Sequence, residues 1–438
     1  MKILLANEAC TIGGVETWMV SLASVYKAMG HDCELFFYEH GAMEQYIPES
    51  IVAHFGDLSD LIRVARARRY DIIHANSTDW HFGISSVRTT GARLVLTSHG
   101  RTVSAWTASN CDGFASCCRW QVAEQQEFED IDVVVIHNGI NTERFKPDEN
   151  VVKTEPPIVA WVGRGNDALQ KRIDKLVPVA KLIKEAGFRL WLIEPHGAEA
   201  IEEVLPGTGR ALVPLADFWS GLPMERMPDL YREIAASGGL ILSTSSFEGL
   251  PMSLLEAQAC GCPVVGPDVQ GVNECVSPEH GGILYPFEME PEKLASLIIE
   301  TLRDRERMES MRKACARHMR EQFSLERMAR DYLRLYEEAL KRRPAPLAGV
   351  RSWLRRARRL SWDKYVEHNW TAGNRQYELS RELAARGDWK MASFIARNAL
   401  FTCPTLFTRP QRALHLLKTN LRSRFSSDHP APSETKAL

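Results

Sequence analysis

The stretch Ser243–Pro263 contains two glutamates whose positions between and within predicted elements could serve ligand binding. The apolar run Leu240–Leu242 predicts a buried strand of a parallel sheet, and the residues from Pro251 onward predict a helix. Glu248 lies in the loop between strand and helix, and Glu256 lies inside the helix. Open α/β sheets bind their ligands at the carboxyl ends of strands, so this loop is a candidate binding site.

The residue types around this loop suit a nucleoside diphosphate. A helix N-terminus offers free N–H groups and the positive end of a dipole to phosphate. A carboxylate can accept hydrogen bonds from both vicinal hydroxyls of a ribose. Ser253 and Glu256 are three residues apart and therefore share a helix face that could line a cleft. The alternative is that Glu248 and Glu256 are both ordinary surface residues.

The string E-G-L-P-x-x-x-x-E-A, in which seven residues separate Glu248 from Glu256, resembles a known signature. It is similar to the E-x7-E motif of retaining glycosyltransferases with the GT-B fold, above all those of family 4. The resemblance covers residues 1–340. It implies that Glu248 contacts the donor sugar, that Glu256 holds the nucleotide ribose, and that the loop offers N–H groups to the diphosphate. The implied donor-binding residues of this stretch are Gly249, Leu250, Pro251, Ser253 and Glu256.

Two segments of the first 100 residues support the resemblance. Residues 12–16 are similar to the G-G-x-E segment of the family, in which Gly13 and Gly14 let the backbone approach the donor. The strand predicted at Leu94–Ser98 is followed by His99, as in the family's T-x-H-G segment. The resemblance implies that His99 lies near the transferred sugar. The strand Asp71–Asn76 carries asparagine where the family has a second histidine, so we expect its His74 to be a packed strand residue.

Two cations are expected to stabilise the leaving group. Arg164 follows the strand predicted at Ile158–Val162, and Lys171 follows a few residues later, as the family pattern requires. Positive charge stabilises a nucleoside diphosphate as the bond to the sugar breaks. The loop is slightly longer than in the family, so either Lys171 or Arg172 would reach the phosphates. The alternative is a solvated loop.

Length, charge and cysteine content narrow the class of protein. A chain of 438 residues predicts two or three domains, and a net charge of -2 does not favour nucleic acid as a partner. The ten cysteines show neither a C-x-x-C pair nor metal-ligand spacing, so we expect no metal and no cofactor besides the nucleotide-sugar substrate. The N-terminus enters a strand directly and no apolar run could span a membrane, which favours a cytoplasmic protein.

The expected architecture is an α/β GT-B fold, with two Rossmann-like domains facing a cleft and a helical C-terminal extension. The predicted parts are an acceptor domain at 1–150, a donor domain at 155–325, a crossover helix at 326–342, a helical extension at 343–425 and a disordered tail at 426–438. The polar linker between the first two domains is placed at Asp148–Pro157.

A basic segment begins at the end of the family resemblance. Lys341–Arg359 contains eight Lys or Arg residues and no acidic residue, and apolar residues recur there at helical spacing. Such a pattern is typical of an amphipathic helix at the interface of an anionic membrane, so residues 341–362 are a candidate peripheral contact at the inner face of the membrane. The alternative is that the apolar stripe packs on the protein and the arginines are solvated.

The resemblance implies a retaining hexosyltransferase. It would move a sugar from a UDP- or GDP-sugar to a hydroxyl of a glycan or lipid-linked acceptor in envelope polysaccharide or glycolipid synthesis. No carboxylate is clearly placed as a glycosyl nucleophile, so we expect the front-face mechanism in which the leaving phosphate helps to deprotonate the acceptor. Three alternatives remain: a nucleotide-sugar epimerase, a catalytically inactive GT-B scaffold or binding protein, and an NAD-dependent oxidoreductase. The last lacks the G-x-G-x-x-G fingerprint.

Overall fold

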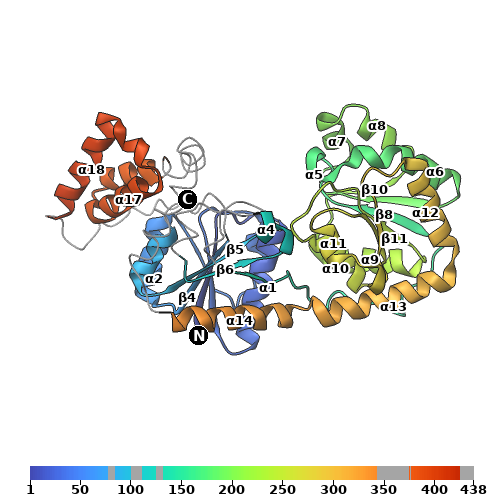
Figure 1. Ribbon diagram of the computed structural model, residues 1–438, viewed down its shortest axis with the longest axis horizontal. Coiled ribbons are helices and arrows are strands. Elements are labelled where there is room, and N and C mark those ends of the chain that lie inside the picture. Colours follow the sequence, from blue (N-terminus) through green and yellow to red (C-terminus); the bar gives the residue numbers. More distant parts are fainter. Residues whose placement is uncertain (77–83, 100–110, 125–131, 343–373, 375, 425–438) are drawn as a thin grey trace. The chain divides into compact units, whose positions relative to one another are not determined.

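The computed structural model describes residues 1–76, 84–99, 111–124, 132–342, 374 and 376–424 (Figure 1). The chain forms two compact units. The first unit contains Met1–Ser116, Glu124–Val135 and Tyr332–Leu438. The second unit contains Cys117–Ala123 and Ile136–Asp331. Two predicted segments lie outside the described residues. They are the membrane segment expected at 341–362, of which only the first two residues are described, and the tail expected at 426–438.

The first unit is built on a parallel sheet of seven strands in the order β3-β2-β1-β4-β5-β6-β7. The strands are β1 (Lys2–Asn7), β2 (Asp32–Phe37), β3 (Ala53–Phe55), β4 (Ile72–Asn76), β5 (Arg93–Ser98), β6 (Gly113–Ser116) and β7 (Val133–Val135). Helices α1 (Gly14–Ala28) and α2 (Leu58–Arg68) and the 3-10 turns η1 (Ala42–Tyr46) and η2 (Ile84–Thr90) connect them. The strand order reverses between β1 and β4, which makes their carboxyl ends the expected ligand edge.

The second unit repeats this plan with six parallel strands in the order β10-β9-β8-β11-β12-β13. The strands are β8 (Ile158–Val162), β9 (Arg189–Ile193), β10 (Asp217–Trp219), β11 (Leu240–Leu242), β12 (Val264–Pro267) and β13 (Ile283–Tyr285). The helices are α4 (Arg119–Glu124), α5 (Ala168–Lys171), α6 (Leu176–Glu185), α7 (Ala198–Val204), α8 (Thr208–Leu212), α9 (Met227–Ala236), α10 (Met252–Ala259), α11 (Val272–Cys275), α12 (Pro291–Arg303) and α13 (Arg305–Gln322). Short 3-10 turns are η4 (Ile173–Lys175), η5 (Met224–Arg226) and η6 (Pro278–His280). The strand order reverses between β8 and β11.

The core of the second unit explains why its strands are apolar without interruption. In β8, Ile158 and Ala160 belong to a cluster with residues of α9 and α10, whereas Val159 and Trp161 belong to a cluster with residues of α6 and α12. Successive side chains of a strand point to opposite faces, so helices bury both faces of the sheet. Because both faces of the sheet are packed, the ends of its strands and the loops that follow them are held in place.

Helix α14 (Leu325–Lys341) begins in the second unit and ends in the first. The units divide the chain at Ile136, earlier than the linker expected at Asp148–Pro157. A backbone pairing accounts for the difference, because the N–H of Ile140 donates to the carbonyl of Phe323 at 2.8 Å and the N–H of Leu325 donates to the carbonyl of Ile140 at 2.9 Å.

The helical extension packs on the first unit (Figure 1). It comprises a helix over residues 376–385, α17 (Trp389–Thr402), the turn η7 (Pro404–Thr408) and α18 (Pro410–Ser423). Leu383 and Ile395 share a buried cluster with Leu61 and Ile62 of α2. None of the described helices is long and apolar enough to cross a membrane.

Candidate active site

Glu248 is the centre of a buried hydrogen-bonded cluster at the carboxyl end of β11. Its carboxylate accepts hydrogen bonds from Lys171 Nζ at 2.6 Å, from Ser245 Oγ at 2.7 Å and from Gln170 Nε2 at 2.9 Å. The side chains of Glu248 and Lys171 are only 7% and 13% exposed. A buried ion pair of this kind is held firmly because both charges need the partner. The cluster therefore presents one carboxylate and one cation in a fixed geometry.

The structure distinguishes the two adjacent cations that the sequence left open. Arg172 has the positive φ of 45° and directs its guanidinium to Asp174, at 2.9 and 2.8 Å, away from Glu248. The backbone of Lys171 is held in place because its carbonyl accepts a hydrogen bond from Thr244 Oγ1 at 2.8 Å. Lys171 is thus the residue of this pair that lies against Glu248.

Arg164 is on the loop that follows β8 but is not part of this cluster. Its side chain is 64% exposed and pairs with Asp167 at 3.3 Å. An exposed ion pair of this kind contributes little to stability, so the guanidinium can exchange its partner at low cost. Of the two cations predicted from the sequence, one is locked to Glu248 and the other remains at the surface.

Glu256 occupies the middle of α10 and is partly buried. Burial raises the pKa of Glu256 to about 7, against the opposing influence of the Arg144 guanidinium and the Tyr231 hydroxyl. A carboxyl group with such a pKa is poised to lose its proton when a ligand donates hydrogen bonds to it. No side chain of the described residues caps α10, whose N-cap residue is Pro251, so the N–H groups of Met252 and Ser253 in its first turn can donate hydrogen bonds to an anion.

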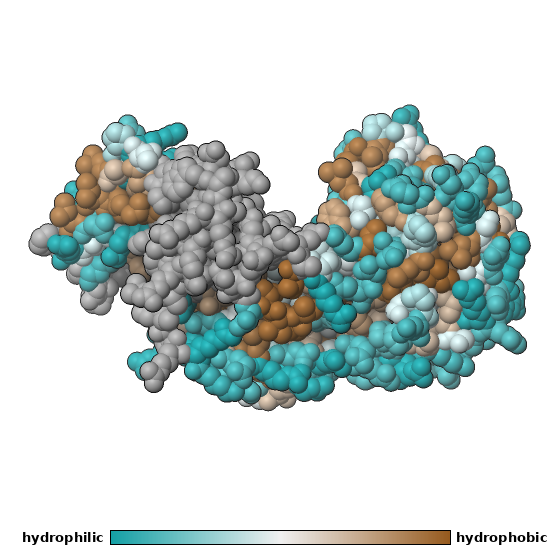
Figure 2. All heavy atoms as spheres, viewed as in Figure 1, coloured by the Kyte–Doolittle hydropathy of each residue, from teal (hydrophilic) through white to brown (hydrophobic). Residues whose placement is uncertain are grey.

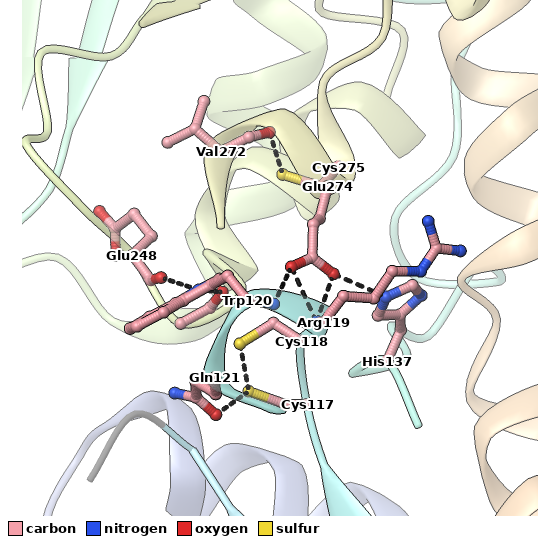
Figure 3. A network of polar contacts seen from close by, with 11 residues as sticks. Cys117, Cys118, Arg119, Trp120, Gln121, His137, Glu248, Val272, Glu274 and Cys275 are labelled. Carbon is pink, nitrogen blue, oxygen red and sulfur yellow. Dashed lines mark hydrogen bonds and ion pairs between the residues drawn. The ribbon is translucent and has the colours of Figure 1, made fainter. Parts of the chain in front are cut away.

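The backbone of the Glu248 loop is held by residues that sequence reasoning missed (Figure 3). Trp120 Nε1 donates to the carbonyl of Glu248 at 2.8 Å and, more weakly, to that of Gly249 at 3.4 Å. On the other side, the N–H of Glu248 donates to the carbonyl of Gln270 at 2.9 Å. A Cβ atom at Gly271, which has a φ of 81°, would lie 2.2 Å from the carbonyl oxygen of Glu248. Glycine is therefore required for this close approach.

Trp120 is itself positioned by Glu274. The Glu274 carboxylate accepts hydrogen bonds from the backbone N–H groups of Arg119 at 2.8 Å and of Trp120 at 3.0 Å, and it pairs with His137 Nε2 at 3.1 Å (Figure 3). Although burial opposes it, these hydrogen bonds lower the pKa of Glu274. The ionised carboxylate thus caps α4 and fixes the indole that supports the Glu248 loop.

In the first unit, the glycine-rich turn after β1 is shaped by a buried carboxylate. Gly13 is the N-cap residue of α1, and a Cβ atom there would lie 2.6 Å from Glu16 Oε2. Glu16 is buried and accepts a hydrogen bond from Asn7 Nδ2 at 3.1 Å. Gly13 therefore leaves room for Glu16, while the neighbouring Gly14 is exposed at the start of α1.

The two predicted histidines of the first unit differ in their hydrogen bonding. His74 uses both ring nitrogens, at 2.6 Å from Tyr336 Oη and 2.7 Å from Thr97 Oγ1, so it is a core residue as expected. His99 follows β5 and packs edge-on against Trp18, but its buried Nε2 has no hydrogen-bond partner among the described residues. Burial lowers the pKa of His74 to about 3 and that of His99 to about 4. Both imidazoles are therefore neutral at pH 7.

Comparison with known families decides the identity. Residues 12–144 match the family described as "Glycosyltransferase Family 4", and residues 142–318 match "Glycosyl transferases group 1". Together the two matches cover residues 12–318, which contain every strand of the two sheets except β1. The chain belongs to the family 4, group 1 glycosyltransferases.

Individual relatives support this assignment. The glycosyltransferase is 26% identical over 331 residues to the alpha-maltose-1-phosphate synthase of Mycolicibacterium smegmatis, a match that covers 64% of this chain and 82% of the relative. It is 23% identical over 295 residues to the UDP-Gal:alpha-D-GlcNAc-diphosphoundecaprenol alpha-1,3-galactosyltransferase of Escherichia coli, covering 58% and 76%. A solved glycosyltransferase structure from Rickettsia africae ESF-5 is similar, with a TM-score of 0.65 and 17% identity over 78% of this chain and 100% of that chain. The fold is GT-B.

The glycosyltransferase brings together only part of the set predicted from its sequence. Glu248 and Lys171 are in direct contact, and the residues Gly249 to Ser253 form the loop and helix start beside them. Glu256 stands further along α10, and Arg164 is apart from the ion pair. Among the described residues, no group of three or more His, Cys, Asp or Glu side chains could hold a metal ion.

Proposed function

We propose that the protein is a retaining glycosyltransferase that transfers a hexose from a UDP- or GDP-sugar to a hydroxyl of a glycan or lipid-linked acceptor. The contact between Glu248 and Lys171 at the start of α10 carries this proposal. It combines a hydrogen-bond acceptor for sugar hydroxyls with a cation and helix N–H groups for a diphosphate. The printed names of two relatives agree, since one uses UDP-Gal and makes an alpha-1,3 linkage and the other is an alpha-maltose-1-phosphate synthase.

The donor would lie with its diphosphate at the N-terminus of α10. Glu256 would accept hydrogen bonds from the ribose hydroxyls, and Glu248 would accept them from the sugar. Lys171 is held by Glu248 and would face the β-phosphate, where negative charge grows in the transition state. Arg164 is exposed and makes only a weak ion pair with Asp167, so it would supply a second cation to the diphosphate.

The transfer step would proceed on one face of the sugar. The bond between the anomeric carbon and the β-phosphate oxygen breaks, and the acceptor oxygen bonds to the anomeric carbon from the same side. The acceptor proton passes to the departing phosphate oxygen, so the products are a glycoside and a nucleoside diphosphate. His99 is neutral at pH 7 and would offer its Nε2, which has no partner among the described residues, to a sugar hydroxyl rather than carry a positive charge. The product would enter an envelope polysaccharide or glycolipid.

Donor binding is tested first by thermal shift with UDP, GDP, ADP and their sugars, because a ligand that binds the folded state raises the melting temperature. The informative variant is the double substitution Lys171→Met and Glu248→Gln. It removes both charges together, since Lys171→Met alone would leave a carboxylate buried without its partner. We expect one nucleotide and its sugar to raise the Tm of the wild type, and the folded double variant to lose turnover. A double variant that transfers sugar at the wild-type rate would refute the proposal.

A further inference from the structure

The last helix of the protein, α18, presents a row of leucines to solvent. Leu414, Leu417 and Leu421 are 65%, 60% and 59% exposed. Their spacing of three and four residues places them on one face of the helix. Figure 2 shows hydrophobic side chains gathered over the region of α17 and α18. We call these three residues the leucine face.

The opposite side of α18 is firmly packed, so the leucine face is not the result of a loose helix. Thr419 is buried, Leu416 packs against the cluster that contains Tyr377 and Phe407, and Asn420 Oδ1 accepts a hydrogen bond from Ser393 Oγ at 2.6 Å. These contacts fix the rotation of α18 about its axis. The leucines are therefore held outward by the fold.

The surroundings of the leucine face are strongly basic. No Asp or Glu occurs between positions 389 and 427, whereas positions 389 to 424 contain seven Lys or Arg residues. Lys418, Arg422 and Arg424 are exposed, and helical spacing places Lys418 and Arg422 on one side of the leucine face and Arg424 on the other. The acidic residues before α17 do not offset this charge, because they pair with arginines of their own: Glu378 with Arg381, Glu382 with Arg386, and Asp388 with Arg63.

We propose that the leucine face binds the surface of an anionic lipid bilayer. Leucines between flanking Lys and Arg residues can enter the boundary of the acyl chains while the cations remain among the phosphate groups. A second copy of the chain fits less well, because two such faces would bring like charges together. A nucleic acid would leave the leucines in water. The proposal concerns a part of the chain outside both family matches and is independent of the transferase reaction.

The test is co-sedimentation of the full chain with vesicles. Vesicles of phosphatidylcholine mixed with an equal part of phosphatidylglycerol are compared with phosphatidylcholine alone, each at low and high salt. We expect binding to the anionic vesicles that weakens as salt rises, because surface attraction is screened. The triple substitution Leu414→Ser, Leu417→Ser and Leu421→Ser should lower the partition coefficient about tenfold or more, since membrane affinity increases with the apolar area that is buried.

A second variant keeps the test valid whatever the first does to folding. Lys418→Gln with Arg424→Gln leaves the leucines intact, should also weaken binding about tenfold, and should reduce its salt dependence. The matched control is Val204→Ser with Val213→Ser, two valines of the second unit that are 48% and 55% exposed, which should bind as the wild type does. Transfer to a water-soluble acceptor should be unchanged in all three variants.

Several results would overturn the proposal. They are the absence of vesicle binding, equal binding to neutral vesicles, and wild-type binding by both the leucine and the charge variant. The fourth is a wild-type dimer that the leucine substitutions separate without any change in vesicle binding. That outcome would make the leucine face an interface between two copies.

Discussion

Glu256 gives the sharpest link between stability and donor binding in this protein. Burial raises the pKa of its carboxyl group from 4.5 to about 7, so the folded protein keeps a proton that the unfolded chain releases. Between pH 4.5 and pH 7 the native state therefore binds more protons, and the contribution of Glu256 to the free energy of unfolding falls as pH rises. We consider the substitution Glu256→Gln, which keeps the shape of the side chain and cannot ionise.

The size of the effect follows from the two pKa values. The gap between 4.5 and about 7 corresponds to about 3 kcal/mol, at about 1.36 kcal/mol for each pH unit. The free energy of unfolding of Glu256→Gln, relative to the wild type, should therefore rise by about 3 kcal/mol between pH 4.5 and pH 8. Thermal unfolding across this range measures it, with the exposed Glu203→Gln as the control.

The substitution Glu256→Gln should also abolish the increase in nucleotide affinity that accompanies ionisation of the Glu256 carboxyl group. If the ribose hydroxyls donate to the Glu256 carboxylate, binding releases a proton below pH 7, and affinity rises by up to about tenfold per pH unit before it levels off. Calorimetry at pH 6 in buffers of different ionisation enthalpy reports that proton directly. A variant that is stabilised at pH 8 but binds the nucleotide as tightly as the wild type would refute the ribose role. A wild-type affinity that is flat from pH 5.5 to pH 8 would do the same.

Three further predictions follow from the hydrogen-bonded clusters. Lys171→Met alone should lower the free energy of unfolding by about 3–5 kcal/mol, because Glu248 keeps a buried charge, and adding Glu248→Gln should restore much of the loss in denaturant unfolding. Trp120→Phe removes the indole donor to the Glu248 carbonyl, so kcat/KM should fall about threefold to tenfold with little change in Tm; steady-state kinetics that match the wild type would contradict its positioning role. His74→Phe should lower stability by roughly 1–3 kcal/mol, since it removes the buried hydrogen bonds of the imidazole with the Tyr336 and Thr97 hydroxyls, while turnover per folded molecule stays constant. A large loss of turnover there would show that His74 does more than pack.

Several strands of both sheets could be predicted because they are short apolar runs followed by glycine or polar loops. Leu240–Leu242, for example, is buried on both faces and is the observed β11. The division between the units was harder to place. The polar linker at 148–157 is the visible feature of the sequence, whereas the actual division depends on the pairing of Ile140 with Phe323 and Leu325, nearly two hundred residues away.

The spacing of Glu248 and Glu256 was enough to single them out as candidate donor-binding residues. The residues that hold the backbone of the Glu248 loop could not be predicted from it. Trp120 stands 128 residues before Glu248, and no sequence pattern marks its indole as a donor to that loop. The choice between Lys171 and Arg172 likewise depends on a single positive φ at position 172, which side-chain chemistry does not reveal. The exposed leucine face of α18 could be recognised only once the packing of its opposite side was known.

We propose above all that the transfer retains the configuration of the donor sugar. Once the thermal-shift screen has identified the donor, proton NMR of the first-formed product measures that configuration directly, with water or a small glycan as the acceptor. An α-linked donor should give an α-configured product, whose signal appears before mutarotation or any later equilibration. A β-configured first product would contradict the mechanism proposed for Glu248 and Lys171.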